Sequence, residues 1–427
     1  MVVLAGIGIQ FMRPKLTNPP VVADLHAPPA VAQILRNSCY NCHSNETKLA
    51  WFDQVAPAYW LVASDVKKAR SHLNFSELGN APKAQQFAFL FEAITQIQFG
   101  AMPLPSYRLA HPESRVTPVQ LAILKSYLES TESHKVADAQ AIAGANEQFT
   151  KWAGAPTSTV TVQPALDGIE FPADYKNWKA ISATDREDNG SLRTVLGNDV
   201  AIKAVQEGQT NPWPDGAIFA KVAWRQMIGA DGTIRPGPFY QVEFMIKESH
   251  TYAGTKGWGW ARWLGTDLHP YGASTSFTDS CISCHLPMRG NDFVYTVPTI
   301  AESSLPAGLP YDPIKWRVIN SGVDQRTSSI YMVFGNDAAV DHARAGSPSP
   351  YPIGSILAMI TWRQQDDPHW FGAKIPGPIH SIEYVGVYPA SYQRFDGEPL
   401  RKSSGGDSAA IAQRVNLILG VKASVMP

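Results

Sequence analysis

The chain has few cysteines, few charges and no long apolar run. Of its 427 residues, 4 are cysteine and 17% are charged, and 36 Lys and Arg stand against 37 Asp and Glu. This near-neutral balance excludes a basic nucleic-acid binder and a protein with an acidic tail. No apolar stretch approaches the roughly 20 residues that a membrane-spanning helix needs. The bulk of the protein is therefore expected to be soluble and to fold into two or three domains.

The N-terminal segment is apolar but short. Residues Val2 to Met12 have no charged side chain and are followed by Arg13 and Lys15. The segment is too short to span a bilayer, and the basic start of a signal peptide is missing. We expect residues 1–20 to be a signal or anchor remnant, with a short strand or loose terminus as the alternative. Membrane anchoring through the N-terminus therefore stays open.

Prolines, glycines and aromatic residues are plentiful, with 33 Pro, 32 Gly, 12 Trp, 15 Tyr and 17 Phe. This composition predicts a loop-rich protein with substantial β structure. Residues 21–135 nevertheless have a helical pattern, because apolar residues from Phe87 to Ile97 recur at helical spacing. Thr117 and Gln120 form the pattern of a capping box at the start of a further helix. Residues 136–164 are rich in Ala, Gly, Thr and Ser and are predicted to be a linker.

The rest of the chain has a β pattern. The segments Ala217–Trp224 and Phe239–Ile246 are rich in β-branched and aromatic residues, and a turn around Gly229–Gly232 separates them. They predict a β-hairpin. A helix is predicted to begin at Asn198 or Asp199, either of which is a good N-cap.

An internal repeat with an offset of 138 residues divides this β-rich part. The matches are Trp178 with Trp316, Gly197-Asn198-Asp199 with Gly335-Asn336-Asp337, and Trp224-Arg225-Gln226 with Trp362-Arg363-Gln364. Several groups in one register indicate a duplicated fold. We therefore expect a first copy over residues 165–300, a second copy over residues 301–400 and a C-terminal tail over residues 401–427. The expected fold class is α+β and multidomain, with an all-α domain followed by two β-rich domains.

The two copies differ in residues that have chemical roles. The first copy contains a Cys pair, whereas the second contains no cysteine, and Lys221 is matched by Met359 and Arg193 by Tyr331. We interpret the shared residues as scaffold and the lost ones as parts of a site.

All four cysteines lie in two motifs, Cys39-Tyr-Asn-Cys42-His43 and Cys281-Ile-Ser-Cys284-His285. Two thiols at this spacing can form thioethers to the vinyl groups of one haem, and the histidine after them can bind its iron. A zinc site needs further ligands after all cysteines are used, and a thioredoxin-type pair does not require histidine twice. The motifs therefore predict two covalently bound c-type haems, which mature in an exported, oxidising compartment such as the periplasm.

The iron at the first motif has a candidate for its sixth ligand. Met102 lies 59 residues after His43 in a proline-stiffened loop. A thioether there would give His/Met ligation, which suits electron transfer. Met102 is otherwise core filler, and His72 and His111 are alternative ligands.

No comparable methionine follows the second motif, because Met288 lies only three residues after His285. Candidates for the distal side come from the hairpin, where Lys221 stands in a largely apolar strand. An amine in such a place is disfavoured as a cation and becomes nucleophilic, although strand lysines are usually surface residues. Arg193 and Glu248 are further candidates for distal polar groups, and a surface role explains each of them equally well.

These motifs resemble those of two known families. Residues 21–130 are similar to a small bacterial haem-binding domain of exported cytochromes, through CYNCH, SHLNFSEL and AMPLPSYRLAHPE. Residues from about 166 to 298 resemble the cytochrome P-460 family, through NGSLRTVLGN, WPDGAIFAKVAW, KGWGWARW and CISCH. The second resemblance implies a β-rich domain with a five-coordinate c-type haem. That family includes enzymes that oxidise hydroxylamine and relatives that bind nitric oxide or carbon monoxide.

The resemblance also implies residue roles. In the hydroxylamine-oxidising members a lysine is covalently joined to the macrocycle, and Lys221 stands at the corresponding position. His285 would be the proximal ligand, with Arg193 and Glu248 as pocket groups. The C-terminal repeat resembles a haemless paralogue of the same fold, which departs from the simpler family pattern and suggests a pseudo-dimer within one chain.

Three functions are consistent with these patterns. The first is a dihaem oxidoreductase, in which hydroxylamine or nitric oxide binds the second haem and electrons leave through the first to a redox partner such as a periplasmic cytochrome. The second is a cytochrome that binds nitric oxide or carbon monoxide without turnover. The third is a plain electron carrier or an assembly subunit.

Overall fold

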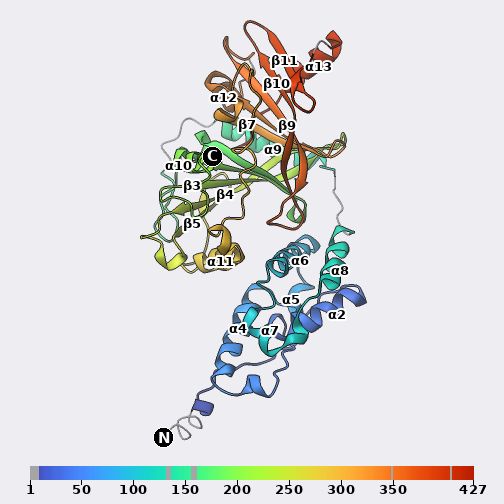
Figure 1. Ribbon diagram of the computed structural model, residues 1–427, viewed down its shortest axis with the longest axis vertical. Helices are drawn as coiled ribbons and strands as arrows, with labels where there is room; N and C mark the ends of the chain where they lie inside the picture. The colour runs from blue at the N-terminus through green and yellow to red at the C-terminus, as the bar shows by residue number, and fades with distance from the viewer. Residues whose placement is uncertain (1–8, 131–135, 155–160, 348–349, 404–405) are drawn as a thin grey trace. The chain divides into compact units, whose positions relative to one another are not determined.

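The computed structural model describes residues 9–130, 136–154, 161–347, 350–403 and 406–427 (Figure 1). The chain divides into two compact units, Met1–Glu132 and Ser133–Pro427. The predicted N-terminal remnant falls partly on residues 1–8, which lie outside the described residues. In the part of the chain that is described, no helix is both long enough and apolar enough to cross a membrane.

The regular structure of the first unit is helical, as predicted. Its helices are α2 (Pro29–Ser38), α3 (Tyr40–His43), α4 (Ala58–His72), α5 (Phe75–Leu78), α6 (Lys83–Gln98), α7 (Pro105–Ala110) and α8 (Pro118–Glu129), with 3-10 turns η1 (Ile9–Phe11), η2 (Phe52–Gln54) and η3 (Pro112–Ser114). The predicted capping box is confirmed, because Thr117 and Gln120 exchange side-chain to backbone hydrogen bonds at 3.2 and 2.9 Å. Helices α6 and α8 pack through the buried residues Leu90, Ile94 and Leu128.

The second unit contains both copies of the repeat. The first copy contains β1 (Lys179–Arg186), β2 (Ser191–Gly197), α10 (Asp199–Gln206), β3 (Ile218–Ile228), β4 (Thr233–Lys247), β5 (Trp258–Leu264), β6 (His269–Pro270) and α11 (Phe277–His285). The second contains β7 (Arg317–Asp324), β8 (Ser329–Gly335), α12 (Asp337–Arg344), β9 (Ile356–Asp366), β10 (Ala373–Gly386), β11 (Ser391–Asp396) and β12 (Arg401–Lys402). Helices α9 (Ala139–Ala153) and α13 (Ser408–Leu419) flank them, and short 3-10 turns are η4 (Tyr175–Asn177), η5 (Glu187–Asn189), η6 (Ala253–Thr255), η7 (Leu286–Asn291) and η8 (Pro313–Lys315).

The strands of the two copies form one sheet. They follow the order β1-β2-β3-β4-β7-β8-β9-β10, and β10 also pairs with β1, so that the path closes on itself. The two joints between the copies are equivalent in the repeat: β4 meets β7 through Thr233–Asp324 and Ile234–Val323, and β10 meets β1 through Lys374–Asp185 and Ala373–Arg186. The duplication therefore gives the pseudo-dimer that the repeat suggested, and the two β-rich copies lie in one compact unit.

The main apolar core of this unit is shared by the two copies. Ala220, Val222 and Trp224 of β3 face it, and their counterparts Ala358, Ile360 and Trp362 of β9 face it from the other copy. Because side chains alternate along a strand, the intervening residues face outward. A smaller apolar cluster lies on the outer face of each copy. Helix α11 lies beside β5 on the first outer face, and α13 lies beside β9 and β10 on the second (Figure 1).

The predicted hairpin and helix start are both confirmed. Strands β3 and β4 pair antiparallel, and the side chain of Asn198 caps α10 by accepting from the Ala201 amide at 3.0 Å. Two register shifts near Trp224 interrupt the hairpin. Beyond these bulges, Lys221 stands directly opposite Glu243.

Two segments expected to be a linker and a tail contain helices instead. Helix α9 lies inside the predicted linker 136–164 and begins at the N-cap Asp138. Its Gln148 exchanges two hydrogen bonds with the backbone of Phe239 on β4, at 3.0 and 2.7 Å. Helix α13 lies inside the predicted tail 401–427 and buries Ile418 completely. In both segments, packing on the sheet outweighs a composition that is typical of loops.

Asp185 is a buried carboxyl group at the joint between β1 and β10. It is 2% exposed, and the equivalent residues Gln226 and Gln364 of the two copies donate to its two oxygens at 2.5 and 3.0 Å. Burial raises the pKa of Asp185 to about 7. An aspartate in an unfolded chain has a pKa of about 3.9. Between these two values the folded state therefore holds a proton that the unfolded state releases.

The free energy of unfolding is therefore expected to fall, through this group, as the pH rises from about 4 to about 7. Asp185→Asn removes the titrating group and flattens this dependence. Urea unfolding of the full chain at about pH 4.5 and about pH 8 measures it. The exposed Asp267→Asn is the control and should behave as the wild type does. The same pH dependence in Asp185→Asn and in the wild type would contradict the assignment.

Candidate functional site

The first Cys-His motif lies at the junction of α2 and α3. The imidazole of His43 donates from Nδ1 to the carbonyl oxygen of Leu73 at 3.1 Å. This bond fixes the tautomer and directs Nε2 to a metal, which is how histidine ligands are commonly held. Burial lowers the pKa of His43, so the neutral form that binds a metal is favoured.

The thiols of the first motif are buried. Burial raises the pKa of Cys39 to about 12 and that of Cys42 to about 11. A thioredoxin-type pair works through a thiolate and therefore needs a lowered pKa. The environment of these two thiols argues against such a redox pair. In the described part of the chain, no cluster of three or more His, Cys, Asp and Glu side chains could hold a bare metal ion.

Met102 lies in the turn between α6 and α7 and is half-buried. A hydrogen bond connects this part of the chain to the first motif, because Asn41 donates to the hydroxyl of Tyr107 in α7 at 3.1 Å. The segment that contains Met102 is thus held against the motif. This placement leaves Met102 as the predicted ligand, and no described contact joins it to His43.

The two alternative histidines have other partners. The ring of His72 is 3.1 Å from a carboxylate oxygen of Glu92. His111 is buried, and its Nε2 is 3.1 Å from a carboxylate oxygen of Asp53. Both histidines are therefore less suited than Met102 to the sixth position.

The second motif ends helix α11 and repeats the arrangement of the first. His285 donates from Nδ1 to the carbonyl oxygen of Phe293 at 2.7 Å, and burial lowers its pKa to about 4. The rings of Trp260 and Tyr295 pack against the imidazole, with centroids 4.5 and 5.1 Å away. The Tyr295 hydroxyl also donates to the carbonyl oxygen of Cys284 at 2.8 Å. Packing and hydrogen bonds thus fix the histidine on several sides.

The second copy of the repeat also contributes residues beside the Cys-His motif of the first copy. Trp370 and His369 lie in the turn between β9 and β10. The Trp370 ring is 5.4 Å from that of Tyr295, and His369 donates from Nδ1 to the Tyr295 carbonyl at 2.6 Å. The copy without cysteines therefore contributes to the surroundings of the motif in the other copy.

A row of charged side chains crosses the outer face of the first copy. Lys221 of β3, Glu243 of β4 and Arg262 of β5 are neighbours in the strand register. Lys221 forms an ion pair with Glu243, and Arg262 lies 3.2 Å from the other oxygen of the same carboxylate. The charges of this row act on both Cys281 and His285, so the row lies close to the second motif.

The electrostatics of the row favour a weakly basic amine. Burial lowers the pKa of Lys221, and the attraction of Glu243 does not fully offset it. Burial alone would raise the pKa of Glu243, but Arg262, Lys221 and Arg193 lower it well below its ordinary value. Glu243 is therefore ionised, while the amine of Lys221 loses its proton more readily than an exposed lysine does.

Of the other two predicted pocket residues, Arg193 lies near the charged row and Glu248 does not. Arg193 lies near the row, because its charge acts on both Lys221 and Glu243, and its Nε donates to Ser191 at 3.1 Å. Glu248 follows the end of β4, where its backbone bonds Gly257 and Tyr252. No described contact brings Glu248 to the row.

Glu243 and Arg262 were not predicted as site residues. The available signal was the hairpin itself, since a residue opposite Lys221 would share its surroundings. The bulges make Glu243 hard to identify from the sequence, because pairing without bulges, counted from Ile228–Ile234, would place Lys221 opposite Gln241.

The buried polar atoms near the second motif fit a haem. Trp260 Nε1 and Arg262 Nε are buried and have no hydrogen-bond partner among the described residues. Such donors are rare in folded proteins and indicate a missing acceptor. The carboxylate groups of a haem are suitable acceptors, while Cys281, Cys284 and His285 would hold the ring and its iron.

The second copy fills the corresponding face with protein. Glu383 stands opposite Met359 in the β9–β10 register, as Glu243 stands opposite Lys221. Arg414 of α13 donates from Nε to Glu383 at 3.0 Å and also contacts the sulfur of Met359 at 3.5 Å. The carboxylate is therefore kept in both copies, but its cationic partner comes from α13 in the second.

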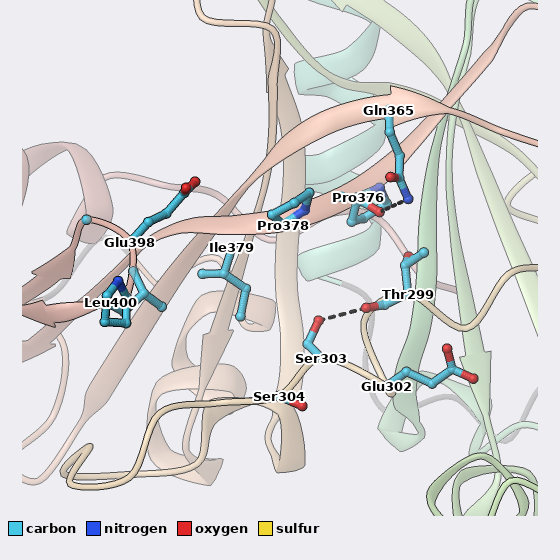
Figure 2. A pocket seen from close by; sticks show the side chains of 13 residues that line it. Thr299, Glu302, Ser303, Ser304, Gln365, Pro376, Pro378, Ile379, Glu398 and Leu400 are labelled. Atoms are coloured by element: carbon cyan, nitrogen blue, oxygen red, sulfur yellow. Dashed lines mark hydrogen bonds between the residues drawn. The ribbon is translucent and has the colours of Figure 1, made fainter.

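A pocket of about 540 Å³ lies in the second unit, and neither motif contributes a residue to its lining. Figure 2 shows that it is bordered by the loop from Thr299 to Ser304 and by Pro376, Pro378 and Ile379 of β10. Ser303 donates to the carbonyl of Thr299 at 2.7 Å, and Gln365 donates to that of Pro376 at 3.1 Å. Both side chains are thus bonded to the backbone, and the lining includes no Cys or His, so the candidate site is placed at the motifs and not in this pocket.

Comparisons with known proteins agree with the two units. A model of the haem-binding domain family matches residues 4–130, and a model of the cytochrome P460 family matches residues 172–296 and 311–393. A search of curated proteins found no match. The matched ranges of the second model fall on the first and second copies of the repeat. The chain thus joins a haem-binding domain, residues 4–130, to a pair of segments, residues 172–296 and 311–393, that belong to the cytochrome P460 family.

Proposed function

We propose that the protein is a dihaem c-type cytochrome that oxidises or reduces a small nitrogen oxide species, such as hydroxylamine or nitric oxide. The observation that supports this proposal most directly is the Lys221–Glu243–Arg262 row beside the second Cys-His motif. An electron carrier needs no charged groups on the open side of its iron, whereas a reaction that moves protons does. The proposed compartment is the periplasm, with the N-terminal segment as an anchor.

The residues of the second motif have distinct roles in this proposal. Cys281 and Cys284 would hold the haem, and His285 would bind its iron. When bound, the haem would supply a place for a small ligand and an acceptor of electrons. The amine of Lys221, which is nucleophilic when neutral, would be the group that forms the covalent link to the macrocycle that the resemblance implies. Because the new C–N bond replaces a C–H bond of the ring, the link also requires an external oxidant that removes two electrons, while two protons are released.

Such a link would also change Glu243. An amine that is joined to the macrocycle no longer contributes a full positive charge, so one of the cations that lower the pKa of Glu243 is removed. The carboxylate then becomes a better acceptor for the protons that hydroxylamine releases on oxidation. Arg262 remains 3.2 Å away and keeps the carboxylate in place.

The first unit supplies the electron-transfer haem. His43 and Met102 would bind its iron from the two sides, which raises the reduction potential and leaves no position for substrate. Electrons would pass from the second haem to the first and then to a partner such as a periplasmic cytochrome. A cytochrome that binds nitric oxide or carbon monoxide without turnover is the alternative outcome of the tests below.

Haem content tests the covalent attachment. We expect a pyridine haemochrome assay of the wild-type chain to give two haems per polypeptide. The double variant Cys281→Ser, Cys284→Ser should lose one of them and keep the low-spin spectrum of the other. A wild-type protein with a single haem would refute the dihaem proposal.

Met102→Ala tests the sixth ligand of the first haem. Loss of the thioether should change this haem from low spin to high spin in the absorption spectrum, without loss of haem. Met227→Ala, in the second unit, is the matched control and should leave the spectrum of the first haem unchanged. A spectrum of Met102→Ala that matches the wild type would mean that another residue is the ligand.

Lys221→Met places in the first copy the residue that the second copy has at the same position. We expect haem to stay attached and hydroxylamine oxidation to fall by about 100-fold or more. The exposed Lys203→Met should keep wild-type turnover. Peptide mapping of the wild type should show Lys221 joined to the macrocycle. An unmodified Lys221, together with nitric oxide binding and no turnover in the wild type, would favour the gas-binding alternative.

A further inference from the structure

The carbonyl that holds His285 belongs to an unusual stretch of backbone. Asp292 and Phe293 have φ angles of 45° and 64°, so two consecutive residues other than glycine lie in the left-handed region. Such residues keep this conformation only where their surroundings hold them, and they are concentrated at functional sites. Phe293 is the residue whose carbonyl accepts the hydrogen bond from His285.

A buried ion pair holds this stretch against the sheet. Lys247, at the end of β4, donates to both carboxylate oxygens of Asp292 at 2.9 and 2.8 Å, and the side chains are only 5% and 9% exposed. The Trp213 amide donates to the same carboxylate at 2.9 Å, and Trp258 Nε1 donates to the Asp292 carbonyl at 2.9 Å. Both carboxylate oxygens and the backbone carbonyl of Asp292 are therefore hydrogen-bonded, and these bonds fix the turn at Asp292 and Phe293.

The second copy provides an internal comparison. The amide of Lys247 bonds the Ala217 carbonyl at 2.9 Å, and the amide of Val387 bonds the Ser355 carbonyl at 3.1 Å. Ala217 and Ser355 are equivalent in the repeat, so Val387 stands where Lys247 stands. The ion pair is thus absent from the copy without a Cys-His motif, whereas the carboxylate at Glu243 and Glu383 is present in both.

We propose that Lys247 and Asp292 are positioning residues for the proximal histidine, because their ion pair fixes the turn that presents the Phe293 carbonyl to His285. The inference rests on the proposed haem at the second motif. A short and well-aligned bond from Nδ1 makes Nε2 more basic and strengthens its hold on the iron. Lys247 and Asp292 therefore determine how firmly His285 stays bound when a ligand occupies the opposite side.

The test uses the full chain with its haems. Asp292→Asn keeps the size of the side chain but removes its charge, and Lys247→Met removes the cation. In both variants we expect the iron–histidine stretching frequency of the ferrous protein, measured by resonance Raman spectroscopy, to fall. After addition of nitric oxide, the equilibrium constant for detachment of His285 should rise by about tenfold. Lys247→Arg preserves the charge and should restore most of both properties.

A matched control separates positioning from stability. Glu383→Gln breaks the ion pair between the buried Glu383 and Arg414, on the outer face of the second copy. It should lower the stability of the unit, as Lys247→Met does, without changing the iron–histidine frequency. If Lys247→Met does not fold, Asp292→Asn and Lys247→Arg still give the comparison.

The outcomes distinguish this inference from the function on which it rests. A wild-type protein without haem at Cys281 and Cys284 refutes the proposed function. A wild-type protein with that haem, together with an unchanged frequency and unchanged histidine detachment in Asp292→Asn and Lys247→Met, refutes the positioning role and leaves the ion pair with a structural role only.

Discussion

The closure of the strand path is the constraint on which the second unit depends. Each copy of the repeat leaves two strands to be paired by the other copy, β1 and β4 in the first and β7 and β10 in the second, and the joints β4–β7 and β10–β1 complete the ring. The shared core follows from this closure, because β3 and β9 each turn one face toward it. The outer faces of the two copies are covered by different helices. One is covered by the helix that ends in the Cys-His motif, and the other by α13.

The candidate site combines hydrophobic packing with a small number of partly buried charges. The rings of Trp260 and Tyr295 pack against His285, and its imidazole donates a hydrogen bond to a backbone carbonyl. On the neighbouring strands, three cations outweigh the effect of burial and lower the pKa of Glu243, so this carboxylate is ionised. Burial lowers the pKa of His285, so its imidazole favours the neutral form. Their protonation states are set by their partners, as expected where burial makes each charge costly.

Much of this arrangement could be predicted from the sequence, and what could not has identifiable causes. The Cys-His motifs, the capping box, the hairpin and the repeat depend on short-range patterns, and each lies where it was expected. Glu243 escaped prediction because bulges shift the strand register near Trp224 by two residues. Trp370 escaped because its role depends on a contact between copies, which no local pattern records. Helix α9 was mistaken for linker because its alanines and glycine resemble loop composition, whereas Phe149 and Trp152 pack it on the core.

The same pair of strand positions has different cationic partners in the two copies: Glu243 pairs with Lys221 in the first, whereas Glu383 pairs with Arg414 of α13 in the second, where Met359 replaces the lysine. In a dimer of identical chains, any substitution appears in both subunits, so neither could give up its prosthetic group while the other kept it. Fusion of the two halves into one polypeptide removes that symmetry. The copy without cysteines can then differ from the other, and it contributes Trp370 to the surroundings of the Cys-His motif. Such a difference between the two halves can arise in a single fused chain but not in a homodimer.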